Sequence, residues 1–144
     1  MYFDVMDNVV IEVPFGKIEI INQCVIHTAN EGVDIGRDEI LVIEEVIKQH
    51  TDGEVGYISN QVNDYSMSAV HLANTLKNTP VIINHLAFVY YSDSRHTALQ
   101  SVLRLLPDNM LINMFDDLGD AKQWIEQCIA DPGDARDLLT DNSL

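Results

Sequence analysis

Histidine and cysteine side chains are the first candidates for chemistry, because they bind metals and activate nucleophiles. The chain has 144 residues, with five histidines and two cysteines. The histidines are spaced too widely for an HxH, HxxxH or HExxH metal pair; they are His27, His50, His71, His85 and His96. His85, within a strand-like segment, is the first to inspect. Cys24 and Cys128 form no CxxC pair, so the sequence predicts neither a metal site nor a disulfide framework.

Two short segments combine residues found in catalytic sites, but helix capping explains both. Ser92, Asp93 and His96 lie in one segment, whereas the members of a catalytic triad converge from separate elements. Asp116 and Asp117 precede a predicted helix, where acidic side chains face the positive end of the helix dipole. The chain also lacks GxSxG, GxGxxG and GxxxxGKS/T motifs. We therefore expect no catalytic residues, no cofactor and no enzymatic activity.

An excess of acidic residues dominates the composition. The chain carries 23 Asp and Glu against 8 Lys and Arg, a formal net charge of −15. Such a charge repels nucleic-acid phosphates and anionic lipids, so we expect no nucleic-acid partner. No apolar run approaches the ~20 residues of a membrane span, and the first residues do not resemble a signal peptide. The sequence predicts a cytoplasmic protein with no membrane span.

The first part of the chain is rich in strand-like segments. Residues 17–21 alternate polar and apolar side chains, as a half-buried strand does, and residues 24–28 follow after a turn at Asn22. These two segments are expected to form an antiparallel hairpin. A further apolar run, at residues 9–13, ends at the turn sequence 14–16.

The rest of the chain alternates between strands and helices. Strands are expected at residues 55–59, 81–91 and 111–115. Helices are expected to begin at Asp34, at Ser66, at Asp93 or Ser94, and near Leu118. Their buried faces are predicted to carry Ile40, Ile43 and Ile47; Met67, Val70, Ala73 and Leu76; Ala98, Leu99, Val102, Leu103 and Leu106; and Leu118, Ala121, Trp124, Ile125 and Cys128. This alternation favours parallel strands joined by helical crossovers, with residues 55–59 at the centre of the sheet.

We therefore predict one α/β domain over residues 1–131. Its mixed sheet has an antiparallel hairpin at the N-terminal end, followed by parallel strands, and helices pack on it. Residues 132–144 are acidic and begin with Pro132 and Gly133, so we expect them to form a flexible tail.

Neutral polar residues gather where two of the predicted strands end. In sheets with parallel strands, ligands bind outside the carboxyl ends of the strands, beside helix N-termini. The candidate binding residues are Ser59, Asn60, Asn63, Tyr65, Ser66, Tyr91, Ser92 and Ser94. They suit a polar ligand group or a loop of a partner protein. The alternative is a loop that satisfies only its own backbone.

Several segments of the chain resemble the SpoIIAA-like, STAS-type domains. The resemblance covers residues 15–130 and is carried by Phe15-Gly16-Lys17, Asn30-Glu31-Gly32-Val33, Gly56-Tyr57-Ile58-Ser59-Asn60, Tyr65-Ser66 and the segment from Phe115 to Ile125. It points most closely to a small group of bacterial proteins of this type with no established activity. It implies a mixed sheet with packed helices and a non-catalytic, regulatory role in which the domain binds a partner protein.

The resemblance also implies two expectations about the site. In the anti-sigma-factor antagonists, a serine at the start of the helix after the central strand is phosphorylated, and Ser66 stands at that location here. Some STAS-type domains bind small or apolar ligands, so the alternative function is a carrier or sensor of a small apolar, lipid-like molecule. An apolar cavity between the helices around 67–76 and 99–106 would favour the carrier, and an exposed apolar patch would favour the partner protein. The identity of the partner and a homodimer are left open.

Overall fold

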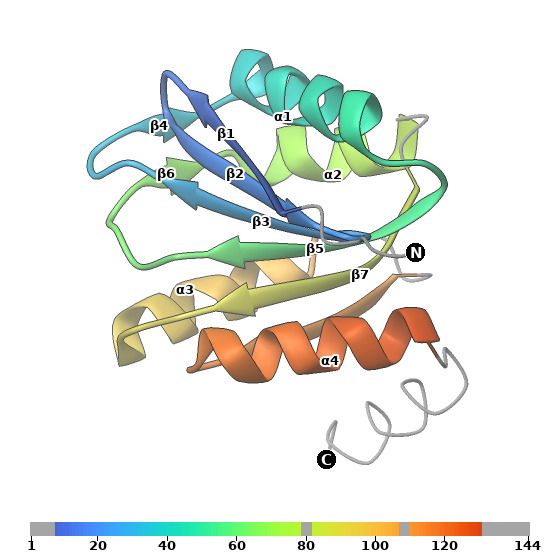
Figure 1. Ribbon diagram of the computed structural model, residues 1–144. Helices are drawn as coiled ribbons and strands as arrows, with labels where there is room; N and C mark the ends of the chain where they lie inside the picture. Colours follow the sequence, from blue (N-terminus) through green and yellow to red (C-terminus); the bar gives the residue numbers. More distant parts are fainter. Residues whose placement is uncertain (1–7, 79–81, 107–109, 131–144) are drawn as a thin grey trace.

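A six-stranded mixed sheet runs through the molecule (Figure 1). The computed structural model describes residues 8–78, 82–106 and 110–130, so the tail predicted at 132–144 lies outside the described residues. The strand order is β1-β2-β3-β5-β7-β8. These strands are β1 (Asn8–Val13), β2 (Gly16–Ile21), β3 (Cys24–Ala29), β5 (Glu54–Asn60), β7 (Ile82–Val89) and β8 (Leu111–Phe115).

The sheet has an antiparallel part and a parallel part. β1, β2 and β3 pair antiparallel, whereas β3, β5, β7 and β8 pair parallel. The predicted mixed sheet is therefore confirmed, and the segment 55–59 lies centrally, between two parallel neighbours. The antiparallel part has one strand more than the predicted hairpin, because the apolar run at 9–13 pairs with β2. Asn22 takes a φ of 57° at the turn between β2 and β3.

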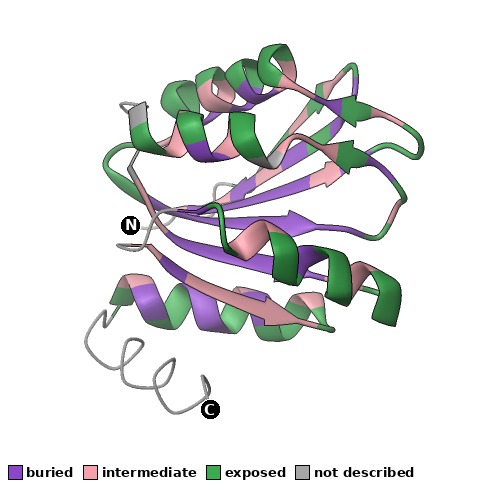
Figure 2. Ribbon diagram, turned by 180° about the vertical axis from the view of Figure 1, so that it is seen from behind, coloured by how far each residue is buried: buried purple, intermediate pink, exposed green. Residues whose placement is uncertain are grey.

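In the described part of the chain, three helices cover one face of the sheet and one helix covers the other. α1 (Arg37–His50), α2 (Ala69–Asn78) and α3 (Asp93–Leu103) share a hydrophobic core with the first face. α4 (Leu118–Ala130) forms a separate core on the opposite face. Figure 1 shows α3 and α4 on opposite sides of β7, and Figure 2 shows that burial is greatest in the central strands.

α4 lies very close to β5 because Gly56 has no side chain. A Cβ atom at Gly56 would lie 2.4 Å from Cγ2 of Ile125. Ile125 and Ala121 are fully buried, and Trp124 is 7 % exposed. The predicted inward face of this helix is confirmed.

A second, two-stranded parallel sheet joins the loops that precede α1 and α2. It consists of β4 (Asp34–Ile35) and β6 (Ser66–Met67). The backbone N–H of Ser66 donates to the carbonyl of Val33 over 3.0 Å. Because both segments are extended, the prediction that helices begin at Asp34 and Ser66 was wrong.

The N-cap of α3 also differs from the prediction. Ser92 is the capping residue, and its Oγ accepts a hydrogen bond from the backbone N–H of Arg95 over 3.2 Å. Asp93 and Ser94 therefore lie inside the first turn rather than at the cap. Asp93 faces the positive end of the helix dipole, as an acidic residue in a first turn does.

The buried faces of the helices follow the predicted spacing except at Val70 and Ala98, which are both exposed. Ile40, Ile43 and Ile47 of α1 are all buried. Val70 of α2, expected on the buried face, is 59 % exposed. Leu72, two residues later, packs against the core. A separation of two residues is more than half a helical turn, so Val70 lies on the opposite side of α2.

Candidate functional site

Three of the polar residues predicted at the carboxyl edge of the sheet, Asn60, Asn63 and Tyr91, form hydrogen bonds there. Asn60, at the end of β5, donates from Nδ2 to Oγ1 of Thr28 over 3.2 Å. The hydroxyl of Tyr91 donates to Oδ1 of Asn60 over 2.6 Å. Asn63 donates from Nδ2 to the backbone carbonyl of Ala29 over 2.9 Å. These bonds join the ends of β3, β5 and β7 into one edge.

Two of the predicted binding residues lie below this edge, inside the protein. Oγ of Ser59 and the hydroxyl of Tyr65 are 3.1 Å apart, and Gln61 donates from Nε2 to Ser59 Oγ over 3.2 Å. Ser59 is 1 % exposed and Tyr65 is 7 % exposed. Burial raises the pKa of the Tyr65 phenol. Ser59 and Tyr65 therefore support the site from beneath and do not offer their polar atoms to solvent.

A buried histidine on β3, which the sequence did not single out, lies beside these residues, with its ring centroid 6.4 Å from that of Tyr65. His27 is fully buried, and its Nδ1 lies 3.0 Å from the hydroxyl of Tyr57. Phe15 contacts it edge-on, with ring centroids 6.0 Å apart. Burial lowers the pKa of His27 from 6.5 to about 4, so the ring is neutral at physiological pH. Its second ring nitrogen, Nε2, is buried without a hydrogen-bond partner among the described residues.

The histidine that the sequence did single out lies elsewhere. His85 is on β7 and 3 % exposed, and its Nδ1 is 4.0 Å from a carboxylate oxygen of Glu54. Glu54 is the first residue of β5, so this contact lies near the amino-terminal end of β5, away from the carboxyl edge that carries the predicted site. Within the described ranges, no group of histidine, cysteine or acidic side chains is arranged to hold a metal ion.

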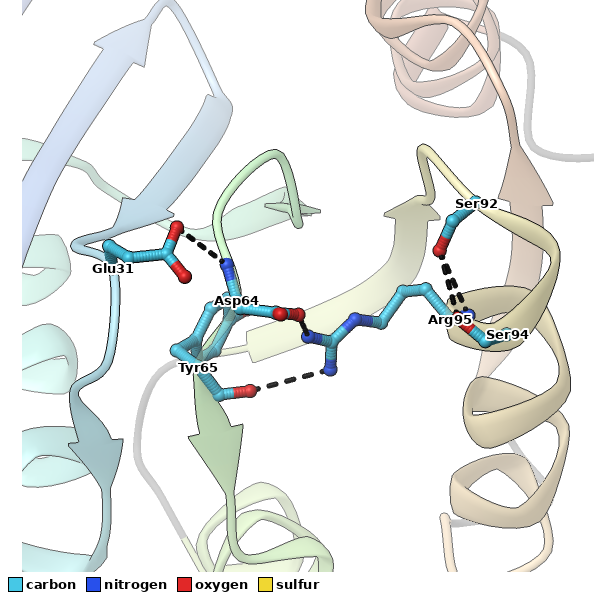
Figure 3. Close-up of polar contacts among 6 residues, drawn as sticks. All are labelled: Glu31, Asp64, Tyr65, Ser92, Ser94 and Arg95. Carbon is cyan, nitrogen blue, oxygen red and sulfur yellow. Dashed lines mark hydrogen bonds and ion pairs between the residues drawn. The ribbon is translucent and has the colours of Figure 1, made fainter.

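Arg95 connects α3 to the loop between β5 and β6 (Figure 3). Its Nη2 donates to Oδ1 of Asp64 over 2.5 Å, and its Nη1 donates to the carbonyl of Tyr65 over 3.3 Å. The guanidinium carbon lies 6.0 Å from the centre of the Tyr65 ring, within reach of a cation–π interaction. The Asp64 side chain is 84 % exposed, so water screens its ion pair with Arg95.

The three remaining serines play local structural parts. Ser66 lies in β6 and donates from Oγ to Oδ1 of Asp34 over 2.5 Å. Ser92 caps α3, and its Oγ is 3.3 Å from that of Ser94.

A polar hollow of about 230 Å³ opens between these groups. Its lining residues are Glu31, Gln61, Val62, Asn63, Asp64, Tyr91, Ser92 and Arg95. Three of the eight predicted binding residues therefore line it: Asn63, Tyr91 and Ser92. Sequence analysis missed Arg95, Gln61 and Glu31, because only the fold brings their separate segments to the same edge.

Two largely apolar cavities, both partly open to solvent, lie beside α2 on the same face of the sheet. The α3 cavity, of about 60 Å³, is lined by Gln61, Tyr65, Met67, Leu72, Phe88, Arg95, Ala98, Leu99 and Val102. The α1 cavity, of about 40 Å³, is lined by Ile40, Ile43, Glu44, Ile47, Tyr57, Ser59, Met67, Leu72, Thr75, Leu76, Ile83, Leu86 and Phe88. The two cavities share Met67, Leu72 and Phe88. The α3 cavity also shares Arg95 and Gln61 with the polar hollow.

No protein-family model matches the chain, and no curated protein or solved structure matches it either. The resemblance to STAS-type domains therefore stays a prediction. Among the described residues, no helix is both long enough and apolar enough to cross a membrane.

Proposed function

We propose that this domain is a non-catalytic sensor or carrier that holds a small, largely apolar molecule beneath α2. The observation that supports the proposal is the pair of cavities on either side of Met67, Leu72 and Phe88. Protein interiors are close-packed, and voids larger than a water molecule are few. Each cavity exceeds the ~10–15 Å³ that a single water needs, yet apolar walls give water few partners. An apolar guest is the better occupant.

The sequence analysis expected a carrier to have an apolar cavity between the segments around 67–76 and 99–106, and the α3 cavity lies between them. Met67 and Leu72, from β6 and α2, face Leu99 and Val102 of α3 across one cavity. A single charged group, Arg95, and a few hydroxyl and amide groups stand at its end, and ligand sites commonly combine apolar walls with a few such polar groups. This arrangement is what a carrier or sensor requires.

We also propose that the chain is a STAS-type domain and that it is cytoplasmic. A STAS-type domain is consistent with an antiparallel N-terminal part, a parallel sheet and helices on both faces. A regulatory role would follow if the bound molecule changed the surface around the polar hollow. Cys24 and Cys128 are free and buried, as suits a reduced, cytoplasmic protein.

Filling the cavities tests this function. Xenon and n-butanol would be titrated into ¹⁵N-labelled protein, and amide shifts around Met67, Leu72 and Phe88 followed. We expect saturable binding to the wild type and none to Leu72→Trp, because the indole fills both cavities. Val70→Trp, which places the same side chain on the exposed side of the same helix, should bind like the wild type. A wild type that binds neither probe, or a Leu72→Trp variant that binds both, would contradict the proposal.

A partner protein that docks over the polar hollow is the second candidate, and two exposed apolar side chains favour it. Val62 is 50 % exposed and Tyr91 is 49 % exposed, and both line the hollow. Tyrosine is enriched in protein interfaces, where it supplies a large area with one polar end. Ser66 is the proposed phosphorylation site in this case. Its phosphate would stand beside Asp34 and repel it, which would weaken the β4–β6 pairing.

The second candidate needs its own measurement. The double variant Val62→Ser, Tyr91→Ser should lose binding to a regulatory partner encoded beside this protein's gene, while n-butanol binding stays unchanged. Ser66→Asp should weaken the same complex, with Ser68→Asp as the control. A partner that binds all variants equally would refute docking at this hollow.

A further inference from the structure

We infer that the molecule held beneath α2 is a short aliphatic carboxylate, whose carboxylate takes Arg95 from Asp64 while its chain enters the α3 cavity. The inference rests on the proposed function and names the ligand class for the same site. It follows from where Arg95 stands, from what Arg95 binds now, and from the size of the cavity.

Arg95 stands at the boundary between a polar and an apolar space. It lines both the polar hollow and the α3 cavity, and no other lysine or arginine of the described chain lines either. A molecule with a charged head and an apolar tail fits such a boundary, with its head in the hollow and its tail in the cavity. Arg95 is the only charged residue that lines both spaces, so a head group that reaches it from the cavity must be anionic and must displace the carboxylate of Asp64.

The present partner of Arg95 shows which anion suits it. The carboxylate of Asp64 accepts from Nη2, while Nη1 holds the carbonyl of Tyr65. Asp64 reaches this position from solvent, with 84 % of its side chain exposed. An ion pair that water screens contributes little to stability, so the carboxylate of a ligand can replace the carboxylate of Asp64 at Arg95. A doubly charged phosphate would instead face the carboxylates of Asp64 and Glu31, which also line the hollow.

The size of the cavity limits the chain. An apolar cavity of about 150 Å³ accommodates benzene, with its six carbons. The α3 cavity is about 60 Å³ and the adjoining α1 cavity about 40 Å³. By proportion they accept roughly two to four carbons. Met67 lies between the two cavities, and its flexible side chain allows some adjustment.

Charge on the head group is tested with three probes of equal chain length: butanoate, n-butanol and butylammonium. Each would be titrated into the wild type and followed by amide shifts in the α3 cavity. We expect butanoate to bind at least about tenfold more tightly than n-butanol, and butylammonium to bind least, because charge-assisted hydrogen bonds to arginine are strong. The net charge of −15 predicts the reverse order for a non-specific effect.

Two variants assign the preference to Arg95. Arg95→Gln should bind butanoate and n-butanol equally, whereas Arg104→Gln, at the exposed C-cap of the same helix, should keep the preference. Asp64→Asn removes the competing carboxylate from an exposed position. It should therefore bind butanoate several-fold more tightly and n-butanol as before, which keeps the test valid if Arg95→Gln does not fold.

The outcomes separate this inference from the proposed function. If n-butanol binds in the cavities but butanoate binds no more tightly, the carboxylate is refuted and the apolar site stands. If Asp64→Asn leaves butanoate affinity unchanged, the exchange at Arg95 is refuted. If none of the three probes binds, the inference fails, and the proposed function fails with it when xenon does not bind either.

Discussion

The two faces of the sheet are built differently, and the difference shows which face has room for the proposed ligand. On one face, a single helix, α4, lies against β5 so closely that only a glycine fits at position 56. On the other face, three helices share the cover, and both apolar cavities lie among them. None of the three hollows described above is lined by a residue of α4. The face covered by α4 is closely packed, and the face covered by α1, α2 and α3 contains the cavities.

The largest expected effect is on the closed face. Ile125→Ala removes a fully buried side chain that packs against Gly56 and the core around it. We expect the free energy of unfolding to fall by about 4 kcal/mol, near the upper part of the range for such truncations. Urea unfolding measures it. A loss below about 1 kcal/mol would show that this face is not closely packed.

The next effect concerns the buried histidine of the open face. Because burial lowers the pKa of His27 from 6.5 to about 4, the unfolded chain binds a proton at this residue that the folded chain does not. Stability is therefore fully present above pH 6.5 and falls as the pH decreases toward 4, by about 3 kcal/mol in total. The variant His27→Gln should lack this part of the pH dependence. Parallel stability curves for the two proteins between pH 7 and pH 4.5 would contradict it.

A truncation on the open face should cost less than its counterpart on the closed face. Leu72 is half-buried and lies between the two cavities, so its contacts are already incomplete. We expect Leu72→Ala to lower the free energy of unfolding by about 1–2 kcal/mol, at most half the cost of Ile125→Ala. The enlarged cavity should also bind xenon more tightly. Equal costs for the two truncations would remove the contrast between the faces.

The smallest effect is expected at the rim of the hollow. Tyr91→Phe deletes the hydroxyl that donates to Asn60 over 2.6 Å, at a side chain that is half exposed. Water can replace this bond, so we expect a loss of about 0.5–1 kcal/mol. This loss would be measured by thermal unfolding, with the variant Tyr90→Phe of the neighbouring tyrosine as the control. A loss above about 2 kcal/mol would mean that the rim is a structural part of the core.

Local patterns in the sequence were enough to predict most of the fold. Buried residues could be predicted from local patterns in three places: the alternation at 17–21, the uncharged segment 55–59 and the spacing of the isoleucines in α1. The starts of α1 and α2 could not be predicted in this way. They depend on pairing between Asp34 and Ser66, and no local preference reports a bond between residues so distant in sequence.

The candidate site was predictable as a location but not as a set of groups. The carboxyl edge follows from the order of strands and helices, and Asn63, Tyr91 and Ser92 do line a hollow there. Arg95 looks like an ordinary residue of a first helical turn until the fold places Asp64 against it. Cavities are defined by what side chains leave unfilled, and no spacing rule describes that.

The pairing of β4 with β6 has a consequence for exchange kinetics. It is two residues long on each strand, and Met67, which it positions, lines both cavities. Short pairings at a surface open far more often than the centre of a sheet, so the amide hydrogen of Ser66 should exchange with deuterium well before those of β5. Each such opening would release the covering of the cavities without unfolding the sheet. Hydrogen exchange at Ser66 would therefore measure how readily this part of the molecule opens for the proposed ligand.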